Sequence, residues 1–254
     1  MFHRSAKPSH YDKEAKNYDT FNEKNSALIN RTLARILKKH RVKTVLDLTC
    51  GTGSQVFWLT KLGLEVTGFD INARMLKIAR SKAPKGVKFL KGDMRTVKVG
   101  QFDAVITIFN AVGHLTKRDF EKAMRNIHSN LQEGGIYIFD IFNLNYLLKD
   151  NRITDLTIDW QKKKGDTIAR EIQYSTIDED GVLASYTTSF EQKVSKKPKI
   201  ARASQTLQIY TAKQLREMLR RNGFNVLSQS GIDGSRWVEN NTDHILTVAR
   251  KITR

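Results

Sequence analysis

Three aspartates recur at regular spacing along the first half of the chain. Asp47 lies in LDLTCGTG after an apolar run, Asp70 closes the next such run 23 residues later, and Asp93 follows in KGDMR after another 23 residues. In an open parallel sheet, ligands bind outside the carboxyl ends of the strands. Carboxylates at three such ends could bind an ammonium group, a ribose diol and the exocyclic amine of adenine.

The loop over residues 49–54 connects the first apolar run to a helix and contains Gly51 and Gly53. Glycine permits unusual dihedrals and close backbone approach to a ligand, although a tight strand–helix turn would also explain the pair. The dinucleotide fingerprint needs a third glycine near position 56, where Val56 stands, and no Lys-Ser/Thr pair makes a phosphate loop. The pattern therefore favours a ligand without phosphate. S-adenosyl-L-methionine is such a ligand, and it carries an ammonium group, a ribose diol and an adenine amine.

The surrounding elements must place these residues at one edge of a sheet. Apolar periodicity predicts alternating helices and strands from residue 26 to about 142, and Thr116 caps a helix that we expect to end at Gly134. Short connections between such elements imply right-handed crossovers. We therefore predict an α/β fold with a doubly wound, mostly parallel seven-stranded sheet, whose strands are 44–48, 65–69, 87–90, 102–108, 135–142, 224–229 and 245–249.

The pattern changes to a period of two between residues 153 and 209. Ile168 and Tyr174 share one face, Tyr186 and Phe190 share another, and Asp180-Gly181 between them is a hairpin signal. This predicts an antiparallel β insert of three or four strands. We assign residues 1–150 and 210–254 to the core, and residues 151–209 to the insert.

The overall composition narrows the classes of function. The 254 residues carry 44 Lys+Arg against 26 Asp+Glu, for a net charge of +18. The cations are spread along the chain, which favours a solvated surface over a nucleic-acid site, though nucleic acid stays possible. The chain shows no apolar run long enough for a membrane span, no secretory N-terminus and one cysteine, Cys50. We therefore expect a cytoplasmic protein without a membrane partner.

Residues 44–142 resemble the core of a class I S-adenosylmethionine-dependent methyltransferase. LDLTCGTG resembles its glycine motif, GFD its ribose-binding acid and GDMR its adenine-contacting turn. YDKEAKNYD, the AVGHL loop and the insert are most similar to the small-molecule N-methyltransferases, including amino-sugar N,N-dimethyltransferases and the glycine/sarcosine type. Thr49 is a departure, because many relatives have Gly or Ala there, and we expect it to reshape the loop slightly.

The resemblance implies a binding site for the cofactor S-adenosyl-L-methionine. Its methionine part would lie near Asp47 and the loop 50–53, its ribose on Asp70, and its adenine between Ile71 and Met75. Each of three residues could instead have a purely structural role: Asp93 as a turn residue, Met75 as a core residue and Cys50 as a small residue that fills the loop. The full set of cofactor-binding candidates is Tyr11, Tyr18, Asp47, Cys50, Gly51, Thr52, Gly53, Asp70, Ile71, Met75, Asp93, Met94 and Phe109.

Two residues are candidates for a catalytic role. His114 lies in the loop that the resemblance places beside the methyl donor, and an imidazole could take a proton from an ammonium acceptor. Tyr18 would lie near the sulfonium in a segment that closes over the cofactor. The structural alternatives are that His114 is an ordinary polar loop residue and that Tyr18 packs as an aromatic residue of an N-terminal helix. The other histidines show no paired spacing, so we predict no metal site.

These observations together predict methyl transfer by in-line displacement to a small-molecule acceptor, at an amine nitrogen. The insert would cover the acceptor, with Trp160, Tyr174, Tyr186 and Phe190 as lining or as sheet packing. We expect a monomer or homodimer. The alternatives are an RNA or protein methyltransferase, or a non-catalytic cofactor- or RNA-binding module. Against nucleic-acid amino methylation, FNAVGH lacks the Asn/Asp-Pro-Pro-aromatic run of those enzymes.

Overall fold

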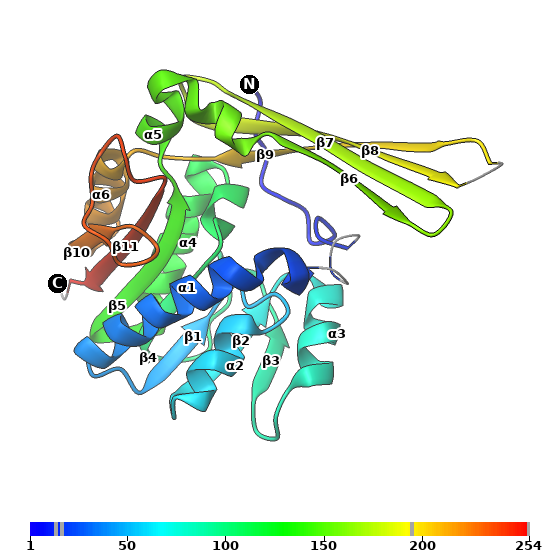
Figure 1. Cartoon of the computed structure of the whole chain (residues 1–254). Helices are drawn as coiled ribbons and strands as arrows, with labels where there is room; N and C mark the ends of the chain where they lie inside the picture. Colours follow the sequence, from blue (N-terminus) through cyan, green and yellow to red (C-terminus); the bar gives the residue numbers. More distant parts are fainter. Residues whose placement is uncertain (13–14, 16–17, 194–195, 253–254) are drawn as a thin grey trace.

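The computed structural model of the chain describes residues 1–12, 15, 18–193 and 196–252, and only the backbone of 20–25. Seven strands form one sheet in the order β10-β11-β5-β4-β1-β2-β3 (Figure 1). The strands are β1 (Thr44–Asp47), β2 (Glu65–Asp70), β3 (Lys88–Lys91), β4 (Phe102–Thr107), β5 (Leu131–Phe142), β10 (Phe224–Ser230) and β11 (His244–Lys251).

Strands β1 to β5 pair in parallel, and β11 pairs antiparallel with both β5 and β10. The chain order reverses beside β1, which lies between β2 and β4. Such a switch point leaves a crevice at the carboxyl ends of the strands. The doubly wound, mostly parallel fold is confirmed, and the loop after β1 lies at its crevice.

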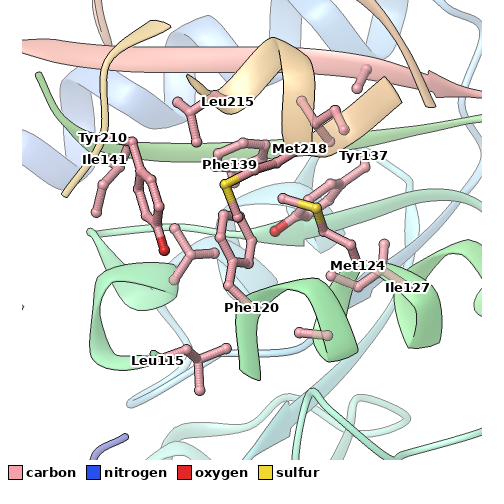
Figure 2. Packing of buried hydrophobic residues seen from close by; sticks show 14 of the residues in the cluster. Leu115, Phe120, Met124, Ile127, Tyr137, Phe139, Ile141, Tyr210, Leu215 and Met218 are labelled. Atoms are coloured by element: carbon pink, nitrogen blue, oxygen red, sulfur yellow. The ribbon is translucent and has the colours of Figure 1, made fainter. Parts of the chain in front are cut away.

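Helices cover both faces of this sheet. Their bounds are α1 (Tyr18–Lys39), α2 (Ser54–Lys61), α3 (Ala73–Lys82), α4 (Lys117–Asn130), α5 (Leu144–Leu148) and α6 (Ala212–Arg221), with short 3₁₀ helices η1 (Ala111–His114) and η2 (Lys149–Leu156). One buried apolar cluster joins α1, α2 and α3 to the sheet. A second cluster joins α4 and α6, and Figure 2 shows Phe120 and Met124 of α4 packed with Phe139 and Met218. None of the described helices combines the length and apolarity required to span a membrane.

The predicted helix caps are confirmed by hydrogen bonds. The Asn72 side chain accepts from the amides of Arg74 and Met75, Thr116 Oγ1 accepts from the amide of Asp119, and Thr211 forms a capping box with Gln214. These bonds satisfy amides that have no partner within their helices.

One predicted helix end is wrong. We expected α4 to reach Gly134, but it ends at Asn130 and Leu131 already pairs with Phe102 in the sheet. The buried Asn130 side chain donates to the carbonyls of Val97 and Asn126, which holds the chain at this point. Leu131 then takes extended dihedrals, and its apolar side chain reaches the core from a strand.

The insert is a four-stranded antiparallel sheet of β6 (Ile158–Lys164), β7 (Thr167–Ile177), β8 (Val182–Lys193) and β9 (Lys199–Gln208). It extends as a long arm away from the larger sheet (Figure 1). The predicted hairpin joins β7 to β8, with Gly181 at a φ of 79° and the Val182 amide donating to Asp178. Tyr174 pairs with Tyr186 across the two strands. The two faces expected from the sequence are therefore one face of the sheet.

Candidate active site

Three cavities meet at the carboxyl ends of the strands. A crevice of about 100 Å³ lies over β2 and β3, a cavity of about 440 Å³ lies between the glycine loop and α1, and a third of about 650 Å³ extends toward the insert. We call the first two the donor side and the third the acceptor cavity. Tyr18 and Phe109 line all three. Two ligands bound on the two sides would therefore meet at these aromatic rings.

The glycine loop has a conformation that other residues adopt only with strain. Gly51 and Gly53 have φ of 52° and 95°, and a Cβ on Gly53 would lie 2.7 to 2.9 Å from the rings of Phe57 and Phe89. A Cβ on Gly51 would come no closer than 4.0 Å to Tyr18. Gly53 is thus required by packing, whereas Gly51 leaves the backbone open to the cavity that it lines.

The other loop residues that we selected lie around the same cavity. Cys50 and Thr52 are buried and line it, and the Thr52 hydroxyl donates to Asp19 at the start of α1. Burial raises the pKa of the Cys50 thiol, and its Sγ would lie 3.1 Å from a Cβ on Gly68. These observations support the interpretation of Cys50 as a loop filler rather than a nucleophile.

Asp70 faces the crevice from the end of β2. Its two carboxylate oxygens accept from the amides of Asn72 at 2.7 Å and Gly51 at 2.8 Å. Because Asn72 supplies the helix cap, Asp70 is not needed for it, and its remaining lone pairs can accept from a ligand. Burial raises the pKa of Asp70 despite these bonds. Ile71 and Met75 line the crevice beside it.

Asp47 lies underneath the loop and lines none of the three cavities. Only 1% of its surface is exposed, and the Thr49 amide donates to its Oδ1 at 3.0 Å. Burial, with a contribution from the charge of Asp70, raises the pKa of Asp47 to about 8 against the effect of that bond. A cation held above the loop would favour the ionised form of this carboxyl group.

Asp93 and Met94 line the crevice at the end of β3, but the Asp93 carboxylate already has a partner. Arg95 Nε and Nη2 bind both of its oxygens at 2.5 to 3.0 Å, and Arg95 Nη1 binds Asp119 at 2.6 Å. No role was assigned to Arg95 from the sequence. The signal for its pairing with Asp93 was an acidic and a basic residue two positions apart in the turn GDMR.

The wall between the donor side and the acceptor cavity is a strained turn. Phe109 and Asn110 have φ of 65° and 54°, which is uncommon for residues other than glycine. Asp140, at the end of β5, accepts from both amides, at 2.6 and 3.3 Å. Sequence reasoning missed Asp140, although an acid inside the apolar run IYIFDIF was a usable signal. Strain of this kind gathers at functional sites.

Tyr18 lies among four carboxylates at the junction. Burial is the larger cause that raises its pKa to about 12, and the charges of four acids contribute: Asp70, Asp140, Asp19 and Asp47. In their ionised forms these acids give the junction a negative potential within a chain of net charge +18. A cation placed beside the Tyr18 ring would be stabilised by the same charges and by the ring itself.

His114 is linked to the junction through Tyr11. Tyr11 Oη lies 2.6 Å from His114 Nε2, and the Tyr11 ring meets the Tyr18 ring edge-on at 5.6 Å. Burial is the larger cause that lowers the pKa of His114 to about 3, and the charges of His10 and His3 contribute. A neutral imidazole with so low a pKa is a weak base. This disfavours the predicted role as a proton acceptor.

The N-terminal segment crosses the crevice. The Ala6 amide donates to the His114 carbonyl at 2.8 Å, and Asn72 Nδ2 donates to the Pro8 carbonyl at the same distance. Ala6, Pro8 and Tyr11 all line the crevice. Residues 6–11 thus lie where the resemblance implied that a segment closes over the cofactor.

The aromatic residues expected to line the acceptor side do not contribute to it. Gln173 of β7 lines the acceptor cavity, and successive strand residues point to opposite faces, so Tyr174 points away. Tyr186 and Phe190 share the face of Tyr174. Within the described residues, Trp160 is not in the lining either, and no cluster of three or more His, Cys, Asp or Glu could hold a metal ion.

Comparison with known proteins gives matches of two kinds. Residues 45–135 match the family described as "Methyltransferase domain". Putative methyltransferase YqeM of Bacillus subtilis is 34% identical over 133 residues, covering 48% of this chain and 54% of that protein. The dTDP-3-amino-3,4,6-trideoxy-alpha-D-glucopyranose N,N-dimethyltransferase of Streptomyces venezuelae is 29% identical over 129 residues, covering 50% of this chain and 53% of that protein.

A solved S-adenosylmethionine-dependent methyltransferase from Clostridium acetobutylicum has the same fold. Its TM-score is 0.75 at 19% identity, over 96% of this chain and 99% of that one. The chain spans about half the length of the two sequence relatives. Residues 45–135, which hold the glycine loop, Asp70 and the strained turn, are the part of the chain that matches the methyltransferase-domain family.

Proposed function

We propose that the protein is an S-adenosyl-L-methionine-dependent methyltransferase that acts on an amine nitrogen of a small molecule. The observation that carries the proposal is the junction, where Tyr18 and Phe109 line the donor side and the acceptor cavity and four carboxylates surround Tyr18. The methyltransferase domain over 45–135 and the amino-sugar relative support it. The cytoplasmic location stays a prediction.

The polar groups of the donor side suit this cofactor. Asp70 presents free lone pairs to a ribose diol, and the open backbone at Gly51, with Asp47 buried beneath the loop, suits an amino acid moiety. Among the described residues, Thr49 Oγ1 is buried without a hydrogen-bond partner and lines the donor side. An acidic moiety of a ligand would satisfy this hydroxyl. Bound there, the cofactor supplies a methyl group on a sulfonium, which is already an activated leaving group.

The chain's own contribution to the reaction is placement. The acceptor nitrogen must approach the methyl carbon on the side opposite the C–S bond, and the N–C bond forms as that bond breaks. Tyr18 and Phe109 form the walls around this line of approach. Placing two reactants correctly can lower the barrier by about 7 to 11 kcal/mol.

The acceptor nitrogen also needs a free lone pair, so an ammonium acceptor must lose a proton first. The neutral His114 is a poor acceptor for it, whereas Asp140 lines the acceptor cavity and burial raises its pKa. We assign the proton to Asp140 or to solvent entering the cavity. His114, held by Tyr11, then orients the acceptor by a hydrogen bond.

Product analysis with a labelled methyl group tests the proposal. The protein is incubated with methyl-labelled S-adenosyl-L-methionine and either a panel of amines or total RNA, and S-adenosylhomocysteine is measured together with the label in each pool. We expect turnover and labelled amine with the panel only. Labelled RNA would favour the polynucleotide methyltransferase, and cofactor binding without any turnover would favour a non-catalytic module.

A further inference from the structure

The acceptor cavity differs in charge from the rest of the molecule. Lys and Arg make up 44 of the 254 residues, yet none is among the described residues that line this cavity. Three aspartates do line it: Asp140, Asp155 and Asp243. A cavity of about 650 Å³ with this lining selects for positive charge in its ligand.

The inner end of the cavity adjoins the donor side. Asp140 is buried there, and each of its oxygens retains a lone pair beyond the bonds from Phe109 and Asn110. His114 Nδ1 is also buried and, within the described part of the chain, has no hydrogen-bond partner. A ligand N–H at this end would satisfy His114 Nδ1 in the tautomer that leaves this nitrogen unprotonated, and the ligand's own lone pair would stay free. The inner end thus suits the nitrogen that is methylated.

The outer end contains the other two aspartates, together with Tyr146. Tyr146 Oη donates to Asp155 at 3.1 Å, and burial, the bond to Asp155 and the charges of Asp155 and Asp243 raise the pKa of Tyr146 against the charge of Arg152. His244 Nδ1 lies 3.0 Å from Asp243, and Arg152 stacks over the Tyr146 ring at 4.6 Å. Arg152 is a nearby cation at this end, and it is outside the lining. Both carboxylates are exposed to solvent.

Strand geometry gives the backbone separation of Asp140 and Asp243. Asn143 follows Asp140 by three residues, and its amide donates to the Asp243 carbonyl at 2.8 Å. At about 3.3 Å per residue, the backbones of Asp140 and Asp243 are about 10 Å apart along β5. A monoamine can reach only one of these ends, whereas a molecule with two amino groups can reach both.

We infer that the acceptor is a diamine, with one nitrogen methylated at the inner end beside Tyr18 and the second held as an ammonium by Asp155 and Asp243. This inference rests on the proposed function. The second ammonium keeps its proton throughout and leaves the reaction unchanged. It supplies affinity and orientation, so the outer aspartates determine specificity rather than chemistry.

Paired substrates separate this inference from the proposed function. Linear diamines from diaminobutane to diaminooctane are compared with amino alcohols of equal length, in which a hydroxyl replaces the distal amine. We expect kcat/KM to be about fivefold or more higher for the best diamine, through KM, since each exposed ion pair contributes modestly. Equal kcat/KM for the two series would contradict the inference that the acceptor is a diamine, and the proposal of amine methylation would still hold. If neither series is methylated, both ideas fail.

A double variant locates the effect. Asp155→Asn with Asp243→Asn should bring the diamine and the amino alcohol to similar KM. The matched control is Asp159→Asn, which removes an exposed carboxylate that pairs with Arg170 on the insert and lies outside the cavity lining. Diamine preference that survives in the double variant, or that is lost equally in the control, would overturn the assignment.

Discussion

The donor side and the acceptor cavity are built from the chain in different ways. Three short stretches that follow β1, β2 and β3, in order along the chain, supply the glycine loop, Asp70 and Asp93 of the donor side, and the N-terminal segment and the loop after β4 complete it. The acceptor cavity takes its walls from segments as distant as Tyr11, Asn110, Gln173 and His244. A site built from local stretches leaves a motif in the sequence, whereas one assembled from distant segments leaves none.

The two sides also differ in how their charges are held. On the donor side, Asp47 and Asp70 are buried and bonded to backbone amides. At the mouth of the acceptor cavity, Asp155 and Asp243 are exposed, with side-chain partners. Substituting a buried charged residue usually changes the free energy of folding or binding by a large amount, and substituting an exposed one changes it by a small amount. Substitutions on the donor side should therefore be the more damaging.

The largest effect should come from Gly53→Ala. The left-handed backbone costs about 1 to 2 kcal/mol and the clash with Phe57 and Phe89 about 1 to 3 kcal/mol of unfolding free energy. Gly63→Ala is the control, because Gly63 has a φ of 83° but nothing within 4 Å of an added Cβ. Denaturant unfolding measures both. If the two variants lose the same stability, packing beneath the glycine loop is not what requires Gly53.

Asp70→Ala should weaken binding of S-adenosyl-L-methionine by about 1.5 to 3 kcal/mol, because a charge-assisted contact is lost. Asp70→Asn keeps one oxygen to accept from the Gly51 amide and controls for loosening of the loop. Calorimetry gives the cofactor affinity, and diamine KM reports the acceptor cavity. An unchanged cofactor affinity would mean that Asp70 does not bind the cofactor. Equal changes in cofactor affinity and in diamine KM would contradict the difference proposed between the donor side and the acceptor cavity.

Cofactor affinity should rise with pH from about pH 5.5 to about pH 7.5. Burial raises the pKa of Asp47 to about 8, so the ligand-free carboxyl is protonated below that pH. A bound cation favours ionisation and so releases a proton, and affinity gains up to about tenfold per pH unit. Calorimetry in buffers of different ionisation enthalpy counts the proton. Asp47→Asn should flatten the profile, and a flat profile in the unmodified protein would contradict the expectation.

The same raised pKa sets the sign of a stability effect. The pKa of Asp47 is higher in the folded state than in the unfolded state. The contribution of Asp47 to the stability of the ligand-free protein is therefore present below about pH 4. It is lost as pH rises through about 8. Saturating cofactor should cancel this loss, which thermal melts at several pH values would show.

The smallest effect should come from Thr49→Val. The Thr49 hydroxyl is buried without a partner among the described residues and faces the donor side. Removing it at constant shape should cost about 0.5 to 1.5 kcal/mol of cofactor affinity, the usual value of one hydrogen bond. Thr49→Ser keeps the hydroxyl and is the control. Tighter binding by the valine variant would mean that the hydroxyl has no ligand partner.

Sequence patterns were sufficient for the sheet, the helix caps and the glycine loop, since all of these depend on neighbours in the chain. Asp70 was recognised because it ends a strand, and Asn72 because it precedes a helix. The pairing of Asp93 with Arg95 was missed, because a short motif does not show which carboxylate is already occupied. Asp140 was missed because its importance comes from a turn 30 residues earlier.

The end of α4 shows a similar limit. Leu131 fits a helical period as well as it fits a strand, and only the buried bonds of Asn130 decide between them. The lining of the acceptor cavity was beyond prediction, since alternation along β7 does not say which face turns inward. Gln173 turned out to face the cavity instead of Tyr174.

The turn held by Asp140 makes the two sides of the site thermodynamically dependent on each other. The ring of Phe109 is a common wall, and its backbone is fixed by a carboxylate that faces the acceptor. A shift of this ring enlarges one compartment at the expense of another. Under the proposed function we therefore expect cooperative binding, in which cofactor and acceptor each change the affinity of the other by the same factor.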